Sequence, residues 1–159
     1  MTVSARSRNN FFLSLLTIIL VIVFDRLTKI FFSDILSLGE SIAVIKNIFH
    51  FTLVHNTGIA FGLFKNQGLL FVVIPVIVCA LLIYNLYLCW STVNMDRWTI
   101  VAFALILAGA IGNLTDRVMF GHVIDFIDFR VWPVFNLADS AITIGTVILL
   151  IKCIPSFSK

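Results

Sequence analysis

The 159-residue sequence contains little charge: 12% of its residues are Asp, Glu, Lys or Arg, whereas 60% are hydrophobic and the mean hydropathy is +1.10. Ordinary soluble domains have about 25% charged residues and far lower hydropathy. The sequence also lacks internal repeats, low-complexity tracts and interdomain linkers. The composition therefore predicts an integral membrane protein that forms a single domain over residues 1–159.

Cysteine is scarce as well, and none of the three cysteines belongs to a CxxC pair. Cys79, Cys89 and Cys153 lie in apolar segments, so we expect them to be packing residues and not disulfide partners or metal ligands. The sequence has no HExxH motif, no GxSxG motif, no glycine-rich phosphate loop, and no histidine pair with i, i+4 spacing. These absences argue against zinc hydrolases, serine hydrolases and nucleotide binding, and the scattered basic residues argue against nucleic acid binding.

Four segments are long and apolar enough to span a membrane, which requires about 20 residues each. They are predicted over about residues 11–32, 68–90, 98–114 and 133–154. Because the connecting loops are short, the sequence predicts an all-α integral membrane protein with a compact four-transmembrane-helix bundle. Arg6 and Arg8 precede the first span as in a secretory signal, but no small-x-small cleavage site follows, and we expect this span to be retained.

The distribution of basic residues predicts the orientation of the spans. The termini and the loop over residues 91–97 hold five Lys or Arg within about 25 residues, whereas the two opposite loops hold four within about 53. Cytoplasmic segments carry the higher density of positive charge. Both termini are therefore expected in the cytoplasm, and the two longer loops on the extracytoplasmic side.

The two outer loops differ in character. Residues 40–64 partly alternate polar residues with β-branched or aromatic ones and contain Asn56-Thr57-Gly58, a pattern that predicts a small surface sheet. Residues 115–132 form a second outer segment that is too short for a domain. It ends at Trp132-Pro133, where Trp is typical of the headgroup region and Pro of a first helical turn.

Polar residues gather at the outer end of the predicted bundle. Charge at membrane depth is costly, so where it occurs it usually serves a function. The polar residues at this level come from several spans and from the outer loops. They are Asp25, Asn56, Asn113, Asp116, Arg117, Asp125, Asn136 and Asp139. Their convergence from separate segments predicts a functional site at the outer membrane face.

Some of these positions also have a structural interpretation. Asp25 and Lys29 are four residues apart, so on a helix they share a face and can form an ion pair that fixes the depth of the helix. Gly109 and Gly112 have a spacing of three, which allows close helix contact. We expect Asp25 and Lys29 to be mainly structural, and the polar cluster that begins at Asn113 to belong to the site.

Asn136 and Asp139 are three residues apart and are predicted about one turn inside the last span, where the positive end of the helix dipole favours an anion. The alternative for Asn136 is a role as the N-cap of the helix. This alternative is weaker for Asp139, because a cap belongs at the start of a helix and an uninterrupted apolar run follows Asp139. Asp125 is flanked by apolar residues. Asp128, three residues further on, fits a solvated loop charge equally well.

Two carboxyl groups that meet in a dry environment cannot both ionise easily, so one pKa rises and one group keeps a proton. If Asp125 and Asp139 meet in this way, the ionised group can activate water while the protonated group hydrogen-bonds a peptide carbonyl, as in an aspartic protease. Nearby Asn and Arg donors can stabilise the oxyanion. The alternatives are a small proton- or ion-coupled transporter and a structural assembly partner. Polarity on one side of the membrane favours the peptidase.

Five ordered blocks resemble those of bacterial lipoprotein signal peptidase, the signal peptidase II family. They are Asp25-Arg26-Leu27-Thr28-Lys29, Asn56-Thr57-Gly58-Ile59-Ala60-Phe61, Gly112-Asn113-Leu114-Thr115-Asp116-Arg117, Val123-Ile124-Asp125-Phe126 and Phe135-Asn136-Leu137-Ala138-Asp139-Ser140. The likeness covers nearly the whole chain. Ala108 departs from it, because the family often has a glycine there, and this departure concerns helix packing and not the chemistry.

The resemblance implies an intramembrane aspartic endopeptidase with Asp125 and Asp139 as the catalytic dyad. The residues implied to line the substrate groove and support the dyad are Asn56, Asn113, Arg117 and Asn136. Those implied to give structural polar support are Asp25, Lys29 and Asp116. The implied substrate is a prolipoprotein whose lipobox cysteine carries diacylglycerol, and the cut falls just before that cysteine.

The resemblance also implies an architecture and partners. Family members have a four-helix bundle, a small outer β-cradle and a short outer helical segment, which we match to residues 40–64 and 115–132. They use no metal or organic cofactor, and the cyclic peptide globomycin inhibits them. We accordingly expect a monomer in the bacterial cytoplasmic (inner) membrane, in contact with lipid and not with nucleic acid.

Overall fold

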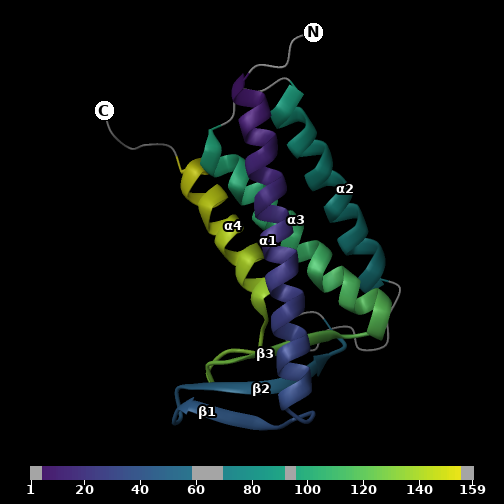
Figure 1. Cartoon of the computed structure of the whole chain (residues 1–159), viewed down its shortest axis with the longest axis vertical. Coiled ribbons are helices and arrows are strands. Elements are labelled where there is room, and N and C mark those ends of the chain that lie inside the picture. Colours follow the sequence, from purple (N-terminus) through teal and green to yellow (C-terminus); the bar gives the residue numbers. More distant parts are fainter. Residues whose placement is uncertain (1–4, 59–69, 92–95, 155–159) are drawn as a thin grey trace.

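The computed structural model describes residues 5–58, 70–91 and 96–154. In these ranges the chain forms a helical bundle with a small antiparallel sheet (Figure 1). The elements are α1 (Ala5–Ile35), β1 (Ser41–Ile45), β2 (Phe49–Asn56), α2 (Leu70–Ser91), α3 (Arg97–Phe120), β3 (Val123–Asp128) and α4 (Leu137–Cys153). The sheet lies at the end of the bundle opposite the first turn of α1 and the last turn of α4.

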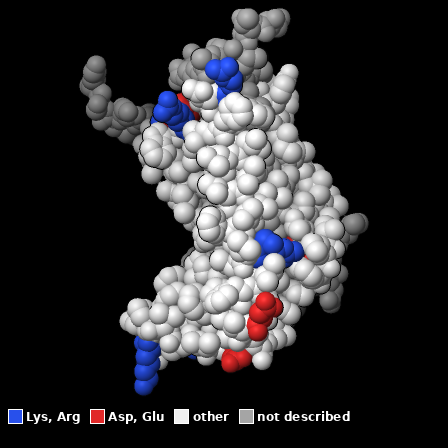
Figure 2. All heavy atoms as spheres, in the orientation of Figure 1, with Lys and Arg blue, Asp and Glu red and all other residues white. Residues whose placement is uncertain are grey.

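The surface of the bundle is largely hydrocarbon. Both α1 and α3 are long and apolar enough to cross a membrane. On α1, Leu20, Phe24 and Leu27 are 46%, 54% and 56% exposed, although water does not favour such side chains. In Figure 2, a wide uncharged zone separates the charged atoms near the upper end of the molecule from those nearer the sheet. These features agree with the predicted membrane protein, and the number of four spans stays a prediction.

α3 is the central helix and contacts the three other helices. A Cβ atom added at Gly109 would collide with the backbone carbonyl of Ala138 on α4, and one at Gly112 would lie 2.7 Å from Oδ2 of Asp25 on α1. Small residues at such positions let helix backbones approach closely. The close helix contact predicted from the spacing of these glycines is confirmed.

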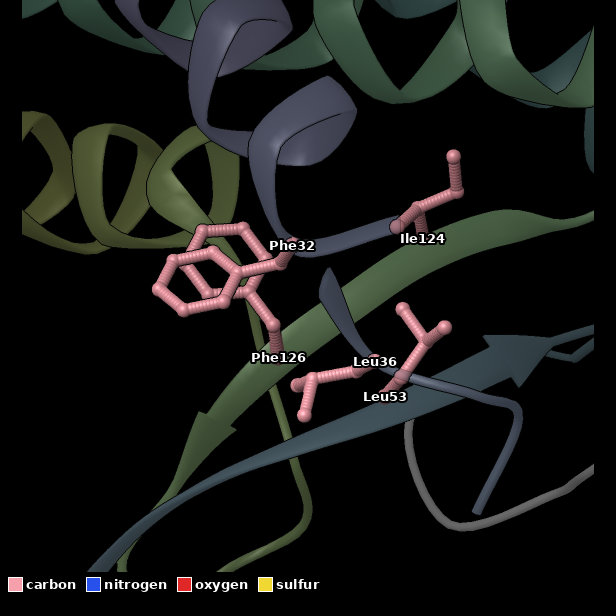
Figure 3. Close-up of a cluster of buried hydrophobic side chains, with 5 residues drawn as sticks. All are labelled: Phe32, Leu36, Leu53, Ile124 and Phe126. Carbon is pink, nitrogen blue, oxygen red and sulfur yellow. The ribbon is translucent and has the colours of Figure 1, made fainter. Parts of the chain in front are cut away.

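The sheet has the strand order β1-β2-β3 and packs against the end of α1. Phe32 and Leu36 from the end of α1 form a buried cluster with Leu53 on β2 and with Ile124 and Phe126 on β3 (Figure 3). The rings of Phe32 and Phe126 stack with centroids 4.3 Å apart. Burying a large apolar side chain contributes about 1.5–3 kcal/mol, so the cluster holds β3 firmly against α1.

This cluster also decides which way Asp125 points. Successive side chains of a strand alternate between the two faces of a sheet. Ile124 and Phe126 contact the α1 cluster, so Asp125 between them faces the other side. Its partner across the ladder is Val54 on β2, and the next pair on the same face is Asn56 with Val123.

Residues 115–132 differ from the predicted outer loop with a helical segment. The segment contains the end of α3, which extends to Phe120 and not to residue 114, and then strand β3. Gly121 ends α3 in the left-handed conformation, with φ of 76°. The strand escaped the sequence interpretation because it is buried on both faces, which removes the alternation of polar and apolar residues. The predicted sheet within residues 40–64 is present as β1 and β2, and residues 59–64 lie outside the described ranges.

The last helix begins later than predicted. α4 starts at Leu137 and not at residue 133, because Phe135 pairs with Ile127 on β3 in an isolated β-bridge. Pro133 therefore precedes the helix and does not lie in its first turn. The short extended segment before α4 brings the start of this helix directly beside β3.

Candidate active site

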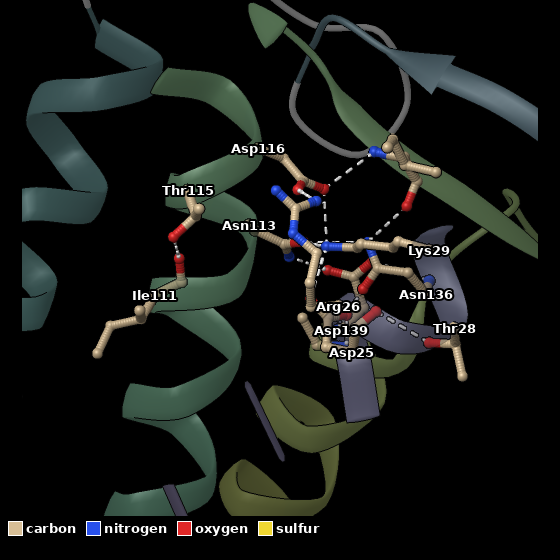
Figure 4. Close-up of polar contacts among 12 residues, drawn as sticks. Asp25, Arg26, Thr28, Lys29, Ile111, Asn113, Thr115, Asp116, Asn136 and Asp139 are labelled. Carbon is tan, nitrogen blue, oxygen red and sulfur yellow. Dashed lines mark hydrogen bonds and ion pairs between the residues drawn. The ribbon is translucent and has the colours of Figure 1, made fainter. Parts of the chain in front are cut away.

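A fully buried lysine organises one side of the polar region (Figure 4). Lys29 on α1 is 0% exposed, and its Nζ lies 2.8 Å from Oδ2 of Asp25 and 2.8 Å from Oδ2 of Asp116 on α3. The predicted ion pair of Asp25 and Lys29 is therefore present, and Asp116 joins it. Arg26, which the sequence interpretation did not assign to the site, contacts Asp116 at 3.1 Å. Two cations thus balance two carboxylates, as buried charges require.

This ion cluster also binds two backbone N–H groups. Oδ1 of Asp25 accepts a hydrogen bond from the N–H of Ala138 in the first turn of α4, at 3.0 Å. Oδ2 of Asp116 accepts one from the N–H of Ile124 on β3, at 3.2 Å. Each N–H belongs to the residue that directly precedes a predicted catalytic aspartate. The cluster therefore fixes the backbone on which both aspartates are carried.

The start of α4 is a reciprocal cap. Oδ1 of Asn136 accepts a hydrogen bond from the N–H of Asp139 at 2.9 Å, and Oδ2 of Asp139 accepts one from the N–H of Asn136 at 3.3 Å. Asn136 is the N-cap, and the two residues form a capping box. The prediction that both lie about one turn inside the helix is wrong. The prediction counted the apolar residues 133–135 as part of the helix, whereas they precede it and Phe135 lies in a β-bridge.

Asp125 on β3 is buried and accepts two amide hydrogen bonds. Nδ2 of Asn136 donates to its Oδ1 at 2.7 Å, and Nδ2 of Asn56 donates to its Oδ2 at 2.9 Å. Burial and the neighbouring charge of Asp139 raise the pKa of Asp125 to about 7, although both amide hydrogen bonds act to lower it. The carboxyl group can therefore hold or release a proton near neutral pH.

Asp139 accepts its side-chain hydrogen bond from α3. Nδ2 of Asn113 donates to Oδ1 of Asp139 at 2.7 Å, and Oδ1 of Asn113 accepts a hydrogen bond from Nδ2 of Asn136 at 3.0 Å. Asn136 in turn donates to Asp125. A continuous chain of side-chain amides therefore connects the two carboxyl groups, and β3, α3 and α4 each supply part of it.

A pocket of about 620 Å³ lies where α2, α3 and α4 meet the sheet. Its polar lining includes Asn56, Asn113, Arg117, Asp125 and Asp139. Most of the lining is apolar, with Val54, Ile74, Pro75, Val78, Val123, Trp132, Pro133, Val134, Phe135 and Ile142. A mainly apolar pocket with a few convergent polar groups and a shifted pKa is the usual form of an active site.

Arg117 lines this pocket and is half-buried. Its charge interacts with those of Asp139, Asp125 and Asp116. The guanidinium donates no hydrogen bond to any residue in the described part of the chain. An arginine in this position can bind carbonyl or carboxylate oxygens of a ligand in the pocket.

The structure brings all nine residues predicted for the site into the pocket, the amide chain or the ion cluster. Of the two interpretations left open for Asp128, the solvated loop charge is not observed, because the residue is 4% exposed and accepts a hydrogen bond from Thr52 at 2.7 Å. Arg130 pairs with the same carboxylate at 3.1 Å. Arg26 was missed, although it lies within the block from Asp25 to Lys29 that drew attention to this helix.

Within the described residues, neither a cysteine nor a metal-binding cluster adds to the site. Cys79 is buried among apolar side chains, as predicted for a packing residue, while the side chains of Cys89 and Cys153 lie outside the described set. Over residues 5–58, 70–91 and 96–154, no three His, Cys, Asp or Glu side chains gather as a potential metal site.

Comparison with known proteins gives a consistent result. A family model described as signal peptidase (SPase) II matches residues 17–155. Proteins named lipoprotein signal peptidase are similar to the chain: that of Halothermothrix orenii is 41% identical, over 86% of this chain and 91% of the relative. That of Moorella thermoacetica is 46% identical, over 85% and 88%. A solved bacterial membrane enzyme has a TM-score of 0.79 and 31% identity, over 92% of this chain and 93% of its own.

Proposed function

The chain belongs to the signal peptidase II family and is a bacterial membrane peptidase that removes signal peptides from lipoproteins, and from this we propose that Asp125 and Asp139 are its catalytic dyad. The observation that carries the proposal is that the two carboxyl groups line one pocket and are joined through the amides of Asn113 and Asn136. The pKa of about 7 at Asp125 supports a dyad that holds one proton near neutral pH.

The direction of the hydrogen bonds supports a shared proton. Each of the four carboxyl oxygens accepts an N–H group, from Asn56 and Asn136 at Asp125, and from Asn113 and the backbone of Asn136 at Asp139. None of these partners offers an acceptor to a carboxyl proton. The hydrogen-bond acceptor for the proton of the dyad is therefore the other aspartate, or water or substrate in the pocket.

In the proposed reaction, the ionised carboxylate takes a proton from water while the water oxygen attacks the scissile carbonyl carbon. The protonated carboxyl group donates a hydrogen bond to the carbonyl oxygen, on which negative charge develops. When the tetrahedral intermediate collapses, the peptide C–N bond breaks and the leaving amine receives a proton from the dyad. We assign the positioning of the peptide and the oxyanion to Asn56, Asn113, Arg117 and Asn136, and structural support to Asp25, Lys29 and Asp116.

We propose that the substrate is a prolipoprotein with a diacylglyceryl cysteine and that the cut falls just before this cysteine. The apolar side of the pocket, with Ile74, Pro75 and Val78 on α2 and Ile142 on α4, suits acyl chains and an apolar signal segment. Asp139 lies in the first turn of α4, and Asp125 lies on strand β3, which follows the end of α3. A lipid-anchored cysteine would hold the scissile bond at this same depth, so depth contributes to specificity.

The orientation follows from the same proposal. Four spans, with both termini in the cytoplasm, would turn the sheet and the dyad toward the extracytoplasmic face of the inner membrane, where a translocated lipoprotein presents its lipidated cysteine. We further propose that the enzyme acts as a monomer without a metal or organic cofactor, and that globomycin inhibits it.

The test of this function uses purified enzyme with diacylglyceryl-modified and unmodified forms of one prolipoprotein, and locates the cut by mass spectrometry. We expect cleavage of the modified form alone, one bond before the cysteine. Equal cleavage of both forms would contradict the proposed substrate, and a cut at another bond would contradict the proposed position of the peptide. Globomycin should block the reaction.

A further inference from the structure

We propose that Lys29 is a positioning residue for the peptidase reaction, because its ammonium group, together with the amide of Asn136, fixes the orientation of the Asn113 amide and so directs an N–H donor at Asp139. This inference rests on the dyad proposed above. It gives the buried lysine a role beyond charge balance with Asp25 and Asp116.

The three protons of the lysine are all used. A lysine ammonium group has three donors and no acceptor. Two donors of Lys29 meet the carboxylates of Asp25 and Asp116, and the third meets Oδ1 of Asn113 at 3.2 Å. The side chain is fully buried, so water does not replace any of these partners.

This third contact selects one of the two orientations of the amide. The side-chain oxygen and nitrogen of Asn113 could exchange places by a rotation of 180°, and only the hydrogen-bond partners distinguish them. With the amide nitrogen toward Lys29, two donors would face each other, and the oxygen would face the carboxylate of Asp139. With the oxygen toward Lys29, Nδ2 lies 2.7 Å from Oδ1 of Asp139. Oδ1 of Asn113 also accepts a hydrogen bond from Nδ2 of Asn136 at 3.0 Å, so the ammonium group and the Asn136 amide together hold the Asn113 donor toward Asp139.

The other two amides of the site are oriented by backbone groups. Oδ1 of Asn136 accepts the N–H of Asp139, and Oδ1 of Asn56 accepts the N–H of Gly58 at 3.1 Å. Asn113 lies inside α3, where backbone N–H groups are already bonded within the helix. Side-chain donors must take their place, and Lys29 on the neighbouring helix supplies one of them beside that of Asn136.

Loss of this donor should lower the rate, because Asp139 is then held less firmly among the charged groups around it. Two charged groups interact directly with Asp139, namely Asp125 on β3 and Arg117 on α3. A third, Asp25 on α1, accepts the N–H of Ala138, the residue that precedes Asp139. The pocket-lining residues of α2 are apolar. Without a fixed Asn113 donor, the carboxyl group of Asp139 loses a hydrogen bond that holds it in place, so the loss should appear in kcat.

The experiment compares Asp25→Asn, which keeps the lysine, with Asp25→Asn combined with Lys29→Met. The combined variant leaves one cation and one carboxylate in the ion cluster, Arg26 and Asp116, so its charge is balanced. If Lys29 only balanced charge, the combined variant would be at least as active as Asp25→Asn. We expect instead a further loss in kcat of about 10- to 100-fold, the size typical of a hydrogen bond to a charged group, with little change in KM.

A double-mutant comparison with Asn113→Ala identifies the route of the effect. In that background no amide remains to be oriented, so we expect Lys29→Met to cause no further loss in kcat. If Lys29→Met and Asn113→Ala reduce kcat by factors that multiply in the combined variant, the two residues act independently and the inference is overturned. Lys152→Gln is the control, since it removes an exposed lysine in the last turn of α4 that pairs with Asp96 at 3.0 Å, at the opposite end of this helix from Asp139, and it should change kcat by no more than about twofold.

Folding is followed by thermal unfolding in detergent. If the Lys29→Met combination does not fold, Lys29→Leu in the same Asp25→Asn background replaces it, because a Leu side chain has no donor for Asn113. A partial loss in kcat is then expected, and full activity would overturn the inference. Asp125→Asn and Asp139→Asn are measured in the same assay. Activity in either would refute the dyad itself, whereas inactivity in both with no effect of Lys29 would refute this inference alone.

Discussion

Asn136 and Asp139 cap α4 reciprocally, through side-chain to backbone hydrogen bonds of 2.9 and 3.3 Å. One proposed catalytic carboxyl group is thus part of a helix cap. The residue that caps the helix also donates its side-chain amide to the other carboxyl group, Asp125, at 2.7 Å. The first turn of α4 therefore sets the relative placement of the dyad, as rigid secondary structure can do for a functional site.

Substitution of Asn136 should separate capping from catalysis. Ser is about as good an N-cap as Asn, but a hydroxyl group is too short to cap the helix and also reach Asp125. We expect Asn136→Ser to keep the cap, and so to be more stable in detergent than Asn136→Ala, and to lower kcat about 10-fold or more. Asn136→Ala should lose activity and, in addition, about 0.5–2 kcal/mol of stability. Wild-type activity in the Ser variant would show that Asn136 acts only as a cap.

The rate should depend on pH through the proton of the dyad. Above about pH 7 Asp125 loses its proton, and at strongly acid pH no ionised base remains, so kcat/KM should follow a bell-shaped profile. Asn56 donates a hydrogen bond that lowers the pKa of Asp125, so Asn56→Ala should move the alkaline limb to higher pH. The exposed neighbour Thr57 provides the control, because Thr57→Ala should leave the limb in place. A limb that moves to lower pH would contradict this assignment.

Stability should follow the same proton. The pKa of Asp125 rises from 3.8 to about 7 on folding, so between these values the folded protein binds more protons than the unfolded chain. The free energy of unfolding should therefore decrease as the pH rises through this window. Thermal unfolding at pH 5 and pH 8 measures the difference, and Asp125→Asn, which cannot ionise, should reduce it. An equal difference in the variant would assign the effect to other groups.

Close packing of α3 against α4 should be sensitive to a single methyl group. In Gly109→Ala the new Cβ would collide with the carbonyl of Ala138, in the first turn of α4. We expect a loss of about 1–3 kcal/mol and reduced activity, since the collision displaces the turn that carries Asp139. Val118→Ala, at an exposed position of the same helix, is the control and should change stability by less than about 0.5 kcal/mol. An unchanged melting temperature in Gly109→Ala would mean that the helices can separate without cost.

Much of the site could be predicted from the sequence, because isolated polar residues in apolar segments are few and conspicuous. The segments that carry Asp25, Asn113 and Asp139 were recognised from hydrophobic runs, and their common level from the order of the spans. The ion pair of Asp25 and Lys29 follows from helical spacing alone, since residues four apart share a face.

The remainder depended on tertiary contacts that leave no local pattern. β3 has no alternation because both of its faces are buried, and its apolar residues resemble a loop at the membrane surface. α3 continues past residue 114 because Asp116 turns inward to Lys29 and does not mark a helix end at the water boundary. The capping role of Asp139 depends on where α4 starts, and helix boundaries are poorly determined by an apolar run that continues on both sides.

The most direct test of the proposed mechanism is cleavage of a diacylglyceryl-modified prolipoprotein by purified Asp125→Asn and Asp139→Asn, with Asp128→Asn as the matched control on the same strand. We expect each dyad variant to lose activity by about 10²- to 10⁴-fold while its melting temperature shows that it is folded, and Asp128→Asn to stay within about threefold of the wild type. Robust turnover by either folded dyad variant would contradict the mechanism.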